Sequence, residues 1–264
     1  MKRSAYWGLL LLLVGALLLL QNFGYLDFLG VSVWQLLWPI ALIGLGVWVL
    51  VGSRRGTSWD TEYLDVGIED ISQADIHIDF GAGELKVGPG TETSSLLAGS
   101  FDGVDKTVRR DGALAKVRLS SPSVVFTPLH WGVTLKRVWD VHLTDRIPIT
   151  VAVKSGACDA RLDLERLKVT ALHIDSGASS TAVTLPANAG YTEVRGSSGA
   201  ASVSIRVPQG VAARIHTSGA LASTSVDQRR FPRSGSDYIS PDYETAPNKV
   251  DIRLDMGVGS IDIS

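Results

Sequence analysis

Two histidines and three aspartates recur at fixed positions from which they could bind a metal ion or exchange protons. His77 and His173 each lie five residues before the alanine of a Gly-Ala pair, Ala82 and Ala178. The carboxylates of Asp79, Asp175 and Asp255 each lie three residues before the second residue of a Gly-Ala or Gly-Val pair. Imidazole and carboxylate groups on one face of a sheet are ligands for divalent metals. Acidic residues on solvent-facing strands explain the pattern more simply, so we predict no metal site, cofactor site or catalytic residue here.

The other residues that could carry chemistry form no recognised motif. The remaining histidines are His130, His142 and His216, and the single cysteine is Cys158. One cysteine excludes a disulfide framework and favours a reducing compartment. The sequence has no G-x-S-x-G, no Cys-x-x-Cys and no Walker loop, and no Lys-Ser/Thr pair follows its Gly-Ala corners. We therefore expect a protein that is not an enzyme.

A short unit that recurs along the chain must position these side chains. Each unit has an alternating apolar segment, a Gly-Ala or Gly-Val corner, and a second alternating segment. Apolar residues fall six and four positions before the central residue of the corner, and three and five positions after it. Because inward residues of one straight strand share parity, this change of parity requires a bend at the corner. The central residues are Ala82, Ala157, Ala178, Ala200, Ala220 and Val258, and those from 157 to 220 are 21, 22 and 20 residues apart.

This repeat predicts an all-β, solenoid-like (β-helix-like) stack of strand-corner-strand units. We expect the small central residues to form an interior column, with glycine beside them where a Cβ would clash. The Ala220 unit fits worst, because Ile215 and Thr224 are each one position out of step, so we expect a distorted repeat there. A sandwich whose strands simply alternate is the other interpretation.

Composition limits the kinds of protein that the chain can be. Of its 264 residues, 45% are hydrophobic, which suggests a membrane segment followed by about one soluble domain. The formal net charge is −2, so nothing in the composition indicates a nucleic-acid partner.

Residues 1–52 predict a transmembrane helical hairpin that precedes the β-repeat domain. Its apolar spans cover about 5–22 and 31–51, and the short loop between them carries one acid, Asp27. Basic residues flank the hairpin, which by the positive-inside rule places the N-terminus and the β domain in the cytoplasm. Two alternatives stay open: the first run is a cleaved signal peptide, or it is too short to span, so that the domain faces outside. The flanking basic residues are Lys2, Arg3, Arg54 and Arg55.

The rest of the chain divides into a linker and a β-repeat domain. We assign 53–61 to the linker and 62–264 to the domain, with an irregular cap at about 88–148 and a long polar loop at 227–248. Within the cap, Gly112 indicates a hairpin turn or a weaker repeat. The aromatic and apolar stretch 120–143 either caps the open end of the stack or docks a partner.

Several of these stretches carry a family resemblance. The segment 38–46 (WPIALIGLG) resembles the membrane segment of LiaI- and LiaF-type bacterial envelope proteins. The segments 147–157, 161–164, 176–178 and 243–261 resemble the toast-rack β domain. This resemblance implies a non-enzymatic component of the envelope-stress response, which in the case of LiaF restrains a membrane histidine kinase.

These observations favour a membrane-anchored regulatory or scaffold protein of the bacterial envelope. We expect its partners to be the membrane and a protein, with a membrane histidine kinase as the candidate that the resemblance implies. The alternative is a self-assembling structural or adhesin-like surface protein, because β stacks expose edges that can pair with another copy.

Overall fold

The computed structural model describes residues 61–92, 94–122 and 137–264, all of which belong to one compact unit. The predicted membrane hairpin at 1–52, nearly all of the linker and the stretch 123–136 lie outside the described residues. Among the described residues, no helix is long and apolar enough to cross a membrane. The strands are β1 Thr61–Gly67, β2 Gln73–Pro89, β3 Ser95–Asp102, β4 Asp105–Asp111, β5 Leu114–Ser120, β6 Arg137–Leu143, β7 Ile149–Asp163, β8 Val169–Thr184, β9 Tyr191–Arg206, β10 Ala212–Val226, β11 Arg233–Ser234, β12 Asp237–Ile239 and β13 Lys249–Ile263.

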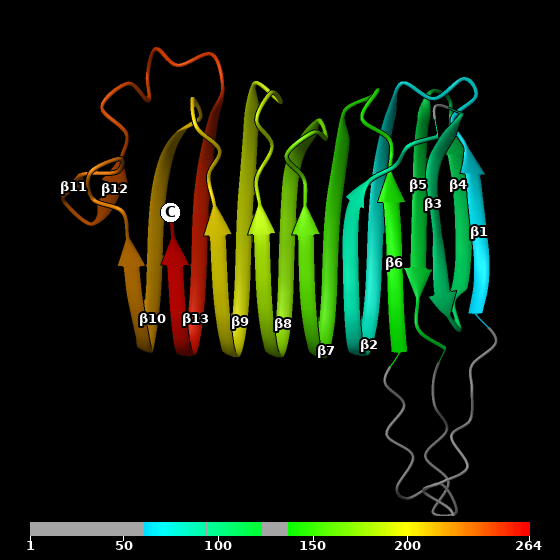
Figure 1. The fold of residues 1–264 in the computed structure, drawn as a ribbon, viewed down its shortest axis with the longest axis horizontal. Helices are drawn as coiled ribbons and strands as arrows, with labels where there is room; N and C mark the ends of the chain where they lie inside the picture. The colour runs from blue at the N-terminus through cyan, green and yellow to red at the C-terminus, as the bar shows by residue number, and fades with distance from the viewer. Residues whose placement is uncertain (1–60, 93, 123–136) are drawn as a thin grey trace, which may run out of the picture. The chain divides into compact units, whose positions relative to one another are not determined.

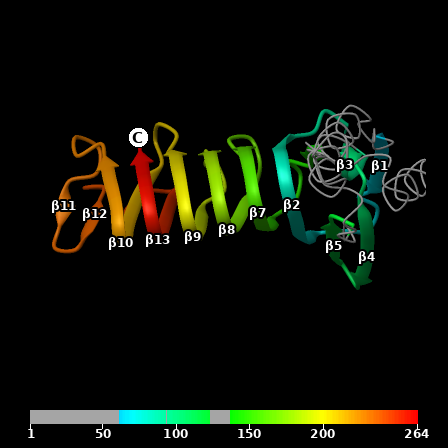
Figure 2. The ribbon, with the colours of Figure 1, turned by 90° about the horizontal axis from the view of Figure 1, so that it is seen from below.

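The predicted stack of strand-corner-strand units is confirmed. Each of the long strands β2, β7, β8, β9, β13 and β10 runs down one layer, turns at the lower edge and returns up the other layer (Figure 1). Neighbouring long strands pair in parallel along almost their whole length, and Figure 2 shows them side by side. We call the layer of first halves the first layer and the layer of second halves the second layer.

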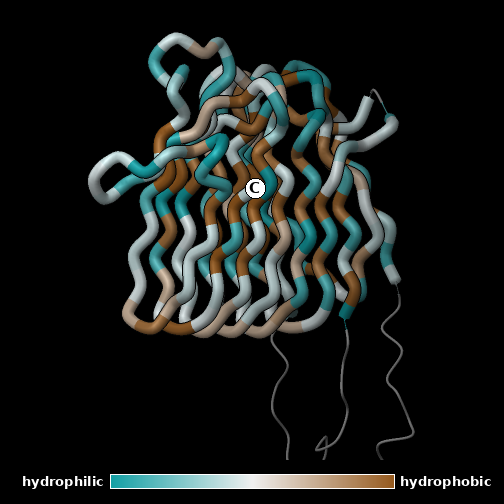
Figure 3. The backbone as a smooth tube through the Cα atoms, turned by 60° about the vertical axis from the view of Figure 1, so that its left-hand side comes forward, coloured by the Kyte–Doolittle hydropathy of each residue, from teal (hydrophilic) through white to brown (hydrophobic). Residues whose placement is uncertain are grey.

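The hydrophobic core lies between the two layers. The apolar positions expected to face inward are buried on both sides of the corner, as with Ile76 and Leu85 of β2 or Leu172 and Val183 of β8. Apolar and polar residues therefore alternate along each strand, as Figure 3 shows. Equivalent core residues of neighbouring strands are in register, so each one packs against its counterparts in the adjacent units.

The corner itself differs from the expected interior column, because its central residues are exposed. Leu221 and Val258 are 76% and 51% exposed, and the alanines at the equivalent positions are also exposed. The chain reverses direction here, so the central side chain points off the convex side of the bend. The space inside is filled by the residue two before, as with Phe80, or one after, as with Cys158. Burial raises the pKa of the Cys158 thiol.

The last repeats are not in sequence order in the sheet, and the distortion expected in the Ala220 unit is absent. β13, the last strand of the chain, lies between β9 and β10. Its register pairs Val258 with Leu221 and Ile252 with Ile215. The central residue of the β10 unit is therefore Leu221 rather than Ala220, and the repeat that looked out of step is regular.

The stretch 88–148 contains strands β3 to β6. β5 pairs with the first half of β2 and β6 with its second half, so together they form one repeat that is divided at the corner. β4 and β5 form a hairpin around Gly112, whose φ of 60° suits glycine. In the stretch 227–248, β12 pairs with the first half of β10, and Phe231 is buried there.

Candidate functional site

The outer face of the first layer carries a line of cationic and imidazole side chains. The residues five positions before each corner pair in register across neighbouring strands, and β5 contributes an arginine at the same level. Adjacent strands are about 4.8 Å apart, so these side chains form a ladder across the layer. We call this ladder the cationic row; it consists of Arg118, His77, Ala152, His173, Arg195, Arg253 and His216.

Carboxylates on both sides of the cationic row hold its arginines. Arg195 donates from Nε and Nη2 to one oxygen of Glu193, at 2.8 and 2.6 Å. Arg118 pairs with Asp79 at 3.2 Å, and Arg253 pairs with Asp251 at 3.2 Å. The Arg118–Asp79 and Arg195–Glu193 pairs are solvent-accessible, and pairs of this kind contribute little to stability, typically about 0.2–1 kcal/mol. The Arg253–Asp251 pair differs, because Asp251 is buried. The main effect of the two solvent-accessible pairs is to fix a pattern of positive and negative charge on the surface.

The row ends at the segment that covers the first half of β10. His216 Nδ1 and Asp237 Oδ1 of β12 are 2.8 Å apart. This hydrogen bond, assisted by one from Ser236, lowers the pKa of Asp237 below its ordinary value. The contact therefore connects the charged face to strand β12.

The structure does not bring together the histidines and aspartates whose side chains could bind a metal. His77 and His173 share a register level, but Ala152 of β7 lies between them, which separates their strands by about 10 Å. Over 61–92, 94–122 and 137–264, no group of three or more His, Cys, Asp or Glu residues is placed to hold a metal ion. Asp175 lies 3.9 Å from Lys154, and Asp255 accepts a hydrogen bond from Ser218.

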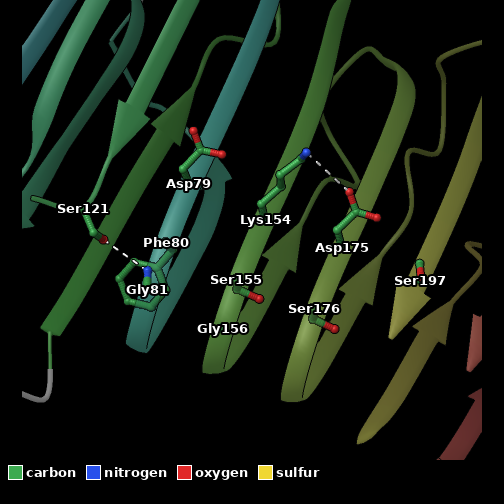
Figure 4. A pocket seen from close by; sticks show the side chains of 10 residues that line it. All are labelled: Asp79, Phe80, Gly81, Ser121, Lys154, Ser155, Gly156, Asp175, Ser176 and Ser197. Carbon is green, nitrogen blue, oxygen red and sulfur yellow. Dashed lines mark hydrogen bonds and ion pairs between the residues drawn. The ribbon is translucent and has the colours of Figure 1, made fainter. Parts of the chain in front are cut away.

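A shallow groove lies between the cationic row and the corners (Figure 4). Its volume is about 600 Å³, and its charged lining residues are Asp79, Lys154 and Asp175. Four serines also line it, together with Phe80, Gly81 and Gly156. Ser121 accepts a hydrogen bond from the Gly81 amide at 3.2 Å. The described histidines are not among its lining residues. The groove can form hydrogen bonds and ion pairs with a polar surface.

Reasoning from the sequence missed most of the cationic row. Arg195 and Arg253 lie five residues before their corners, as His77 and His173 do, so the offset was a usable signal. His216 has the same offset only when the unit is centred on Leu221. Arg118 had no such signal, because β5 ends without a corner. Of the other histidines, His142 lies 3.6 Å from Asp140 and His130 lies outside the described residues.

The fold and the apolar N-terminal segment together define a class: a β-repeat domain carried by a membrane-associated envelope protein. Residues 55–206 match the family model described as the N-terminal domain of toast_rack, DUF2154. The chain belongs to this toast-rack family. Residues 5–50 match the LiaI-LiaF-like transmembrane region, which supports membrane association. Neither match is to a family of enzymes.

One solved structure shows the same fold, and a second is less similar. A candidate cell adhesion protein from Clostridium sporogenes superposes with a TM-score of 0.70 at 17% identity, covering 77% of this chain and 98% of that one. A candidate adhesin from Bacteroides fragilis is 11% identical, covers 78% and 97% of the two chains, and has a TM-score of 0.25. No curated protein is similar enough to count as a relative.

Proposed function

We propose that this protein is a non-enzymatic regulator or scaffold of the envelope that holds a partner protein on the cationic row. The observation that supports this most is the row itself, which keeps one register across neighbouring strands of the first layer. Complementary charge patterns give specificity and faster association more than affinity. The row and its flanking carboxylates suit a partner that presents an acidic stripe between basic ones.

The partner that the family suggests is a membrane sensor histidine kinase. In the proposed mechanism, the membrane segment holds the β domain near the kinase, and the charged face binds one conformation of the kinase. Such binding shifts the equilibrium between the two states of a sensor only by the difference in binding free energy for those states. The domains that we propose are the hairpin at 1–52, the linker at 53–61 and the β-repeat domain at 62–264.

Affinity purification of the full chain from detergent-solubilised membranes tests the charged face. We expect the Arg118→Glu/Arg195→Glu double variant to recover at least about tenfold less of the partner, because both changes replace a positive charge of the row with a negative charge that repels an acidic stripe. Arg161→Glu is the matched control, since Arg161 is also an exposed arginine paired with a glutamate, Glu84, but lies in the second layer. Equal recovery with the double variant and the control would exclude the cationic row as the docking surface.

We also propose that the N-terminus and the β domain face the cytoplasm. The four basic residues that flank the predicted hairpin resist transfer at about 2.3 kcal/mol per charge per 100 mV. Reporters fused after Ser264, one active only in the cytoplasm and one only outside, should give a cytoplasmic signal. An outside signal would contradict the kinase partner and favour a surface role.

A second candidate function is self-association, as in a structural or adhesin-like surface protein. One observation favours it: among the described residues, β12 pairs with only Arg214 and Ile215 of the edge strand β10. The name of the Clostridium structure agrees with a surface role.

A further inference from the structure

The second half of β10, residues 221–226, is an open strand edge. Within the part of the chain that the structure describes, these residues pair with β13 on one side and with no strand on the other. β12 pairs only with Arg214 and Ile215, in the first half of the same strand. Among the described residues, the fold therefore pairs part of the first half of this edge and leaves the backbone groups of 221–226 available.

The core is also uncovered at this edge. Thr224 is in register with Ile261 of β13, which is in register with Val203 of β9 and, through it, with Thr181 of β8, so the four residues form one inward-facing column. Ile261, Val203 and Thr181 are 1%, 7% and 2% exposed, whereas Thr224 is exposed. One further strand, with small or apolar residues facing inward, would complete the column.

The sequence of this edge does not resist strand pairing. Natural edges are commonly protected by charged residues, which oppose the addition of another strand. β1, at one end of the sheet, carries Glu62 and Asp65, and the edge strand β4 carries five charged residues in seven. The segment Leu-Ala-Ser-Thr-Ser-Val at 221–226 carries none.

We propose that this edge pairs with the same edge of a second copy, in antiparallel orientation. A two-fold axis normal to the layer pairs inward residues with inward residues only if it passes midway between one residue and the same residue of the second copy. An axis at Thr224 places Ala222 opposite Val226 and Ser223 opposite Ser225. No charge opposes another, and the exposed Thr224 packs against its symmetry mate. Because the contact is isologous, it closes as a dimer and does not propagate.

This inference rests on the second candidate function, self-association, and is independent of the partner proposed for the cationic row. The edge lies in the second layer, whereas the row lies on the outer face of the first. Loss of the dimer and loss of the partner are therefore separate outcomes.

Cysteine crosslinking of the full chain in detergent tests the register. Opposed residues in an antiparallel pair have Cα atoms about 4.5–5.5 Å apart, which is within the range of a disulfide. Under mild oxidation we expect Thr224→Cys to give mostly covalent dimer, and Ser223→Cys and Ser225→Cys to crosslink only when mixed with each other. The wild-type chain, whose only cysteine is the buried Cys158, is the blank.

Tyr63→Cys is the matched control, because Tyr63 is 63% exposed on the edge strand β1 at the other end of the sheet. We expect it to give at least about tenfold less dimer than Thr224→Cys. Equal crosslinking at Tyr63, or more crosslinking of Ser223→Cys or Ser225→Cys alone than of Thr224→Cys, would overturn the proposal. As a second measurement, Ser223→Lys should halve the protein mass of the micelle complex found by light scattering. A mass that stays dimeric in this variant, or is monomeric in the wild type, would also overturn it.

Discussion

Gly177→Val is expected to lower the free energy of unfolding by about 3 kcal/mol or more, the upper part of the range for single substitutions. A Cβ at Gly177 would lie 2.8 Å from the carbonyl oxygen of Gly156 in the neighbouring unit. Real Cβ atoms rarely approach backbone that closely, and the parallel ladder on both sides prevents either strand from moving away. Equilibrium denaturation of the full chain, followed by circular dichroism of the strands, measures the effect.

The control is Asp175→Ala, two residues earlier on the same strand. The Asp175 side chain is 58% exposed and makes a long ion pair of 3.9 Å with Lys154. Such a pair contributes little, so the free energy of unfolding should change by less than about 0.5 kcal/mol. If both substitutions lowered stability equally, the close packing of the corners would not be what makes glycine necessary at 177.

Trp139→Ala is expected to cost about 3–5 kcal/mol of stability, the usual range for removing a buried tryptophan. Trp139 is fully buried on β6, with its ring 5.1 Å from that of Phe80 and 5.4 Å from that of Phe101. Its contacts join β6 to both β2 and β3. Thermal unfolding should show a large decrease in the melting temperature. We also expect β1 and β3 to be held less firmly, because β3 pairs with β6 and β1 pairs with β3.

Trp139→Phe separates the loss of volume from the loss of the indole N–H. Among the described residues, Trp139 Nε1 is buried without a hydrogen-bond partner. Phenylalanine removes that unsatisfied donor and keeps a ring between Phe80 and Phe101, so the cost should be at most about half that of alanine. A loss as large as that of Trp139→Ala would indicate a requirement for the indole itself.

The hydrophobic pattern of the sequence was sufficient to predict the repeating unit. Inward positions such as Ile76, Leu85, Leu172 and Val183 are buried as predicted, because side-chain parity in a strand is a local property. The corner glycines were also predicted to be architectural. The predicted interior column was wrong, because which side of a bend faces the core depends on how tightly the two layers approach there.

Long-range pairing was decided only in the tertiary structure. Nothing in the sequence order indicates that β13 lies between β9 and β10, or that β5 and β6 form one divided repeat. Every unit of this repeat presents equivalent backbone groups and similar inward residues to its neighbour. The local sequence pattern therefore does not determine in which order the units lie in the sheet. Register then depends on all contacts of the stack together. The cationic row and the open edge at 221–226 both follow from that register, because each exists only once the strands have found their neighbours.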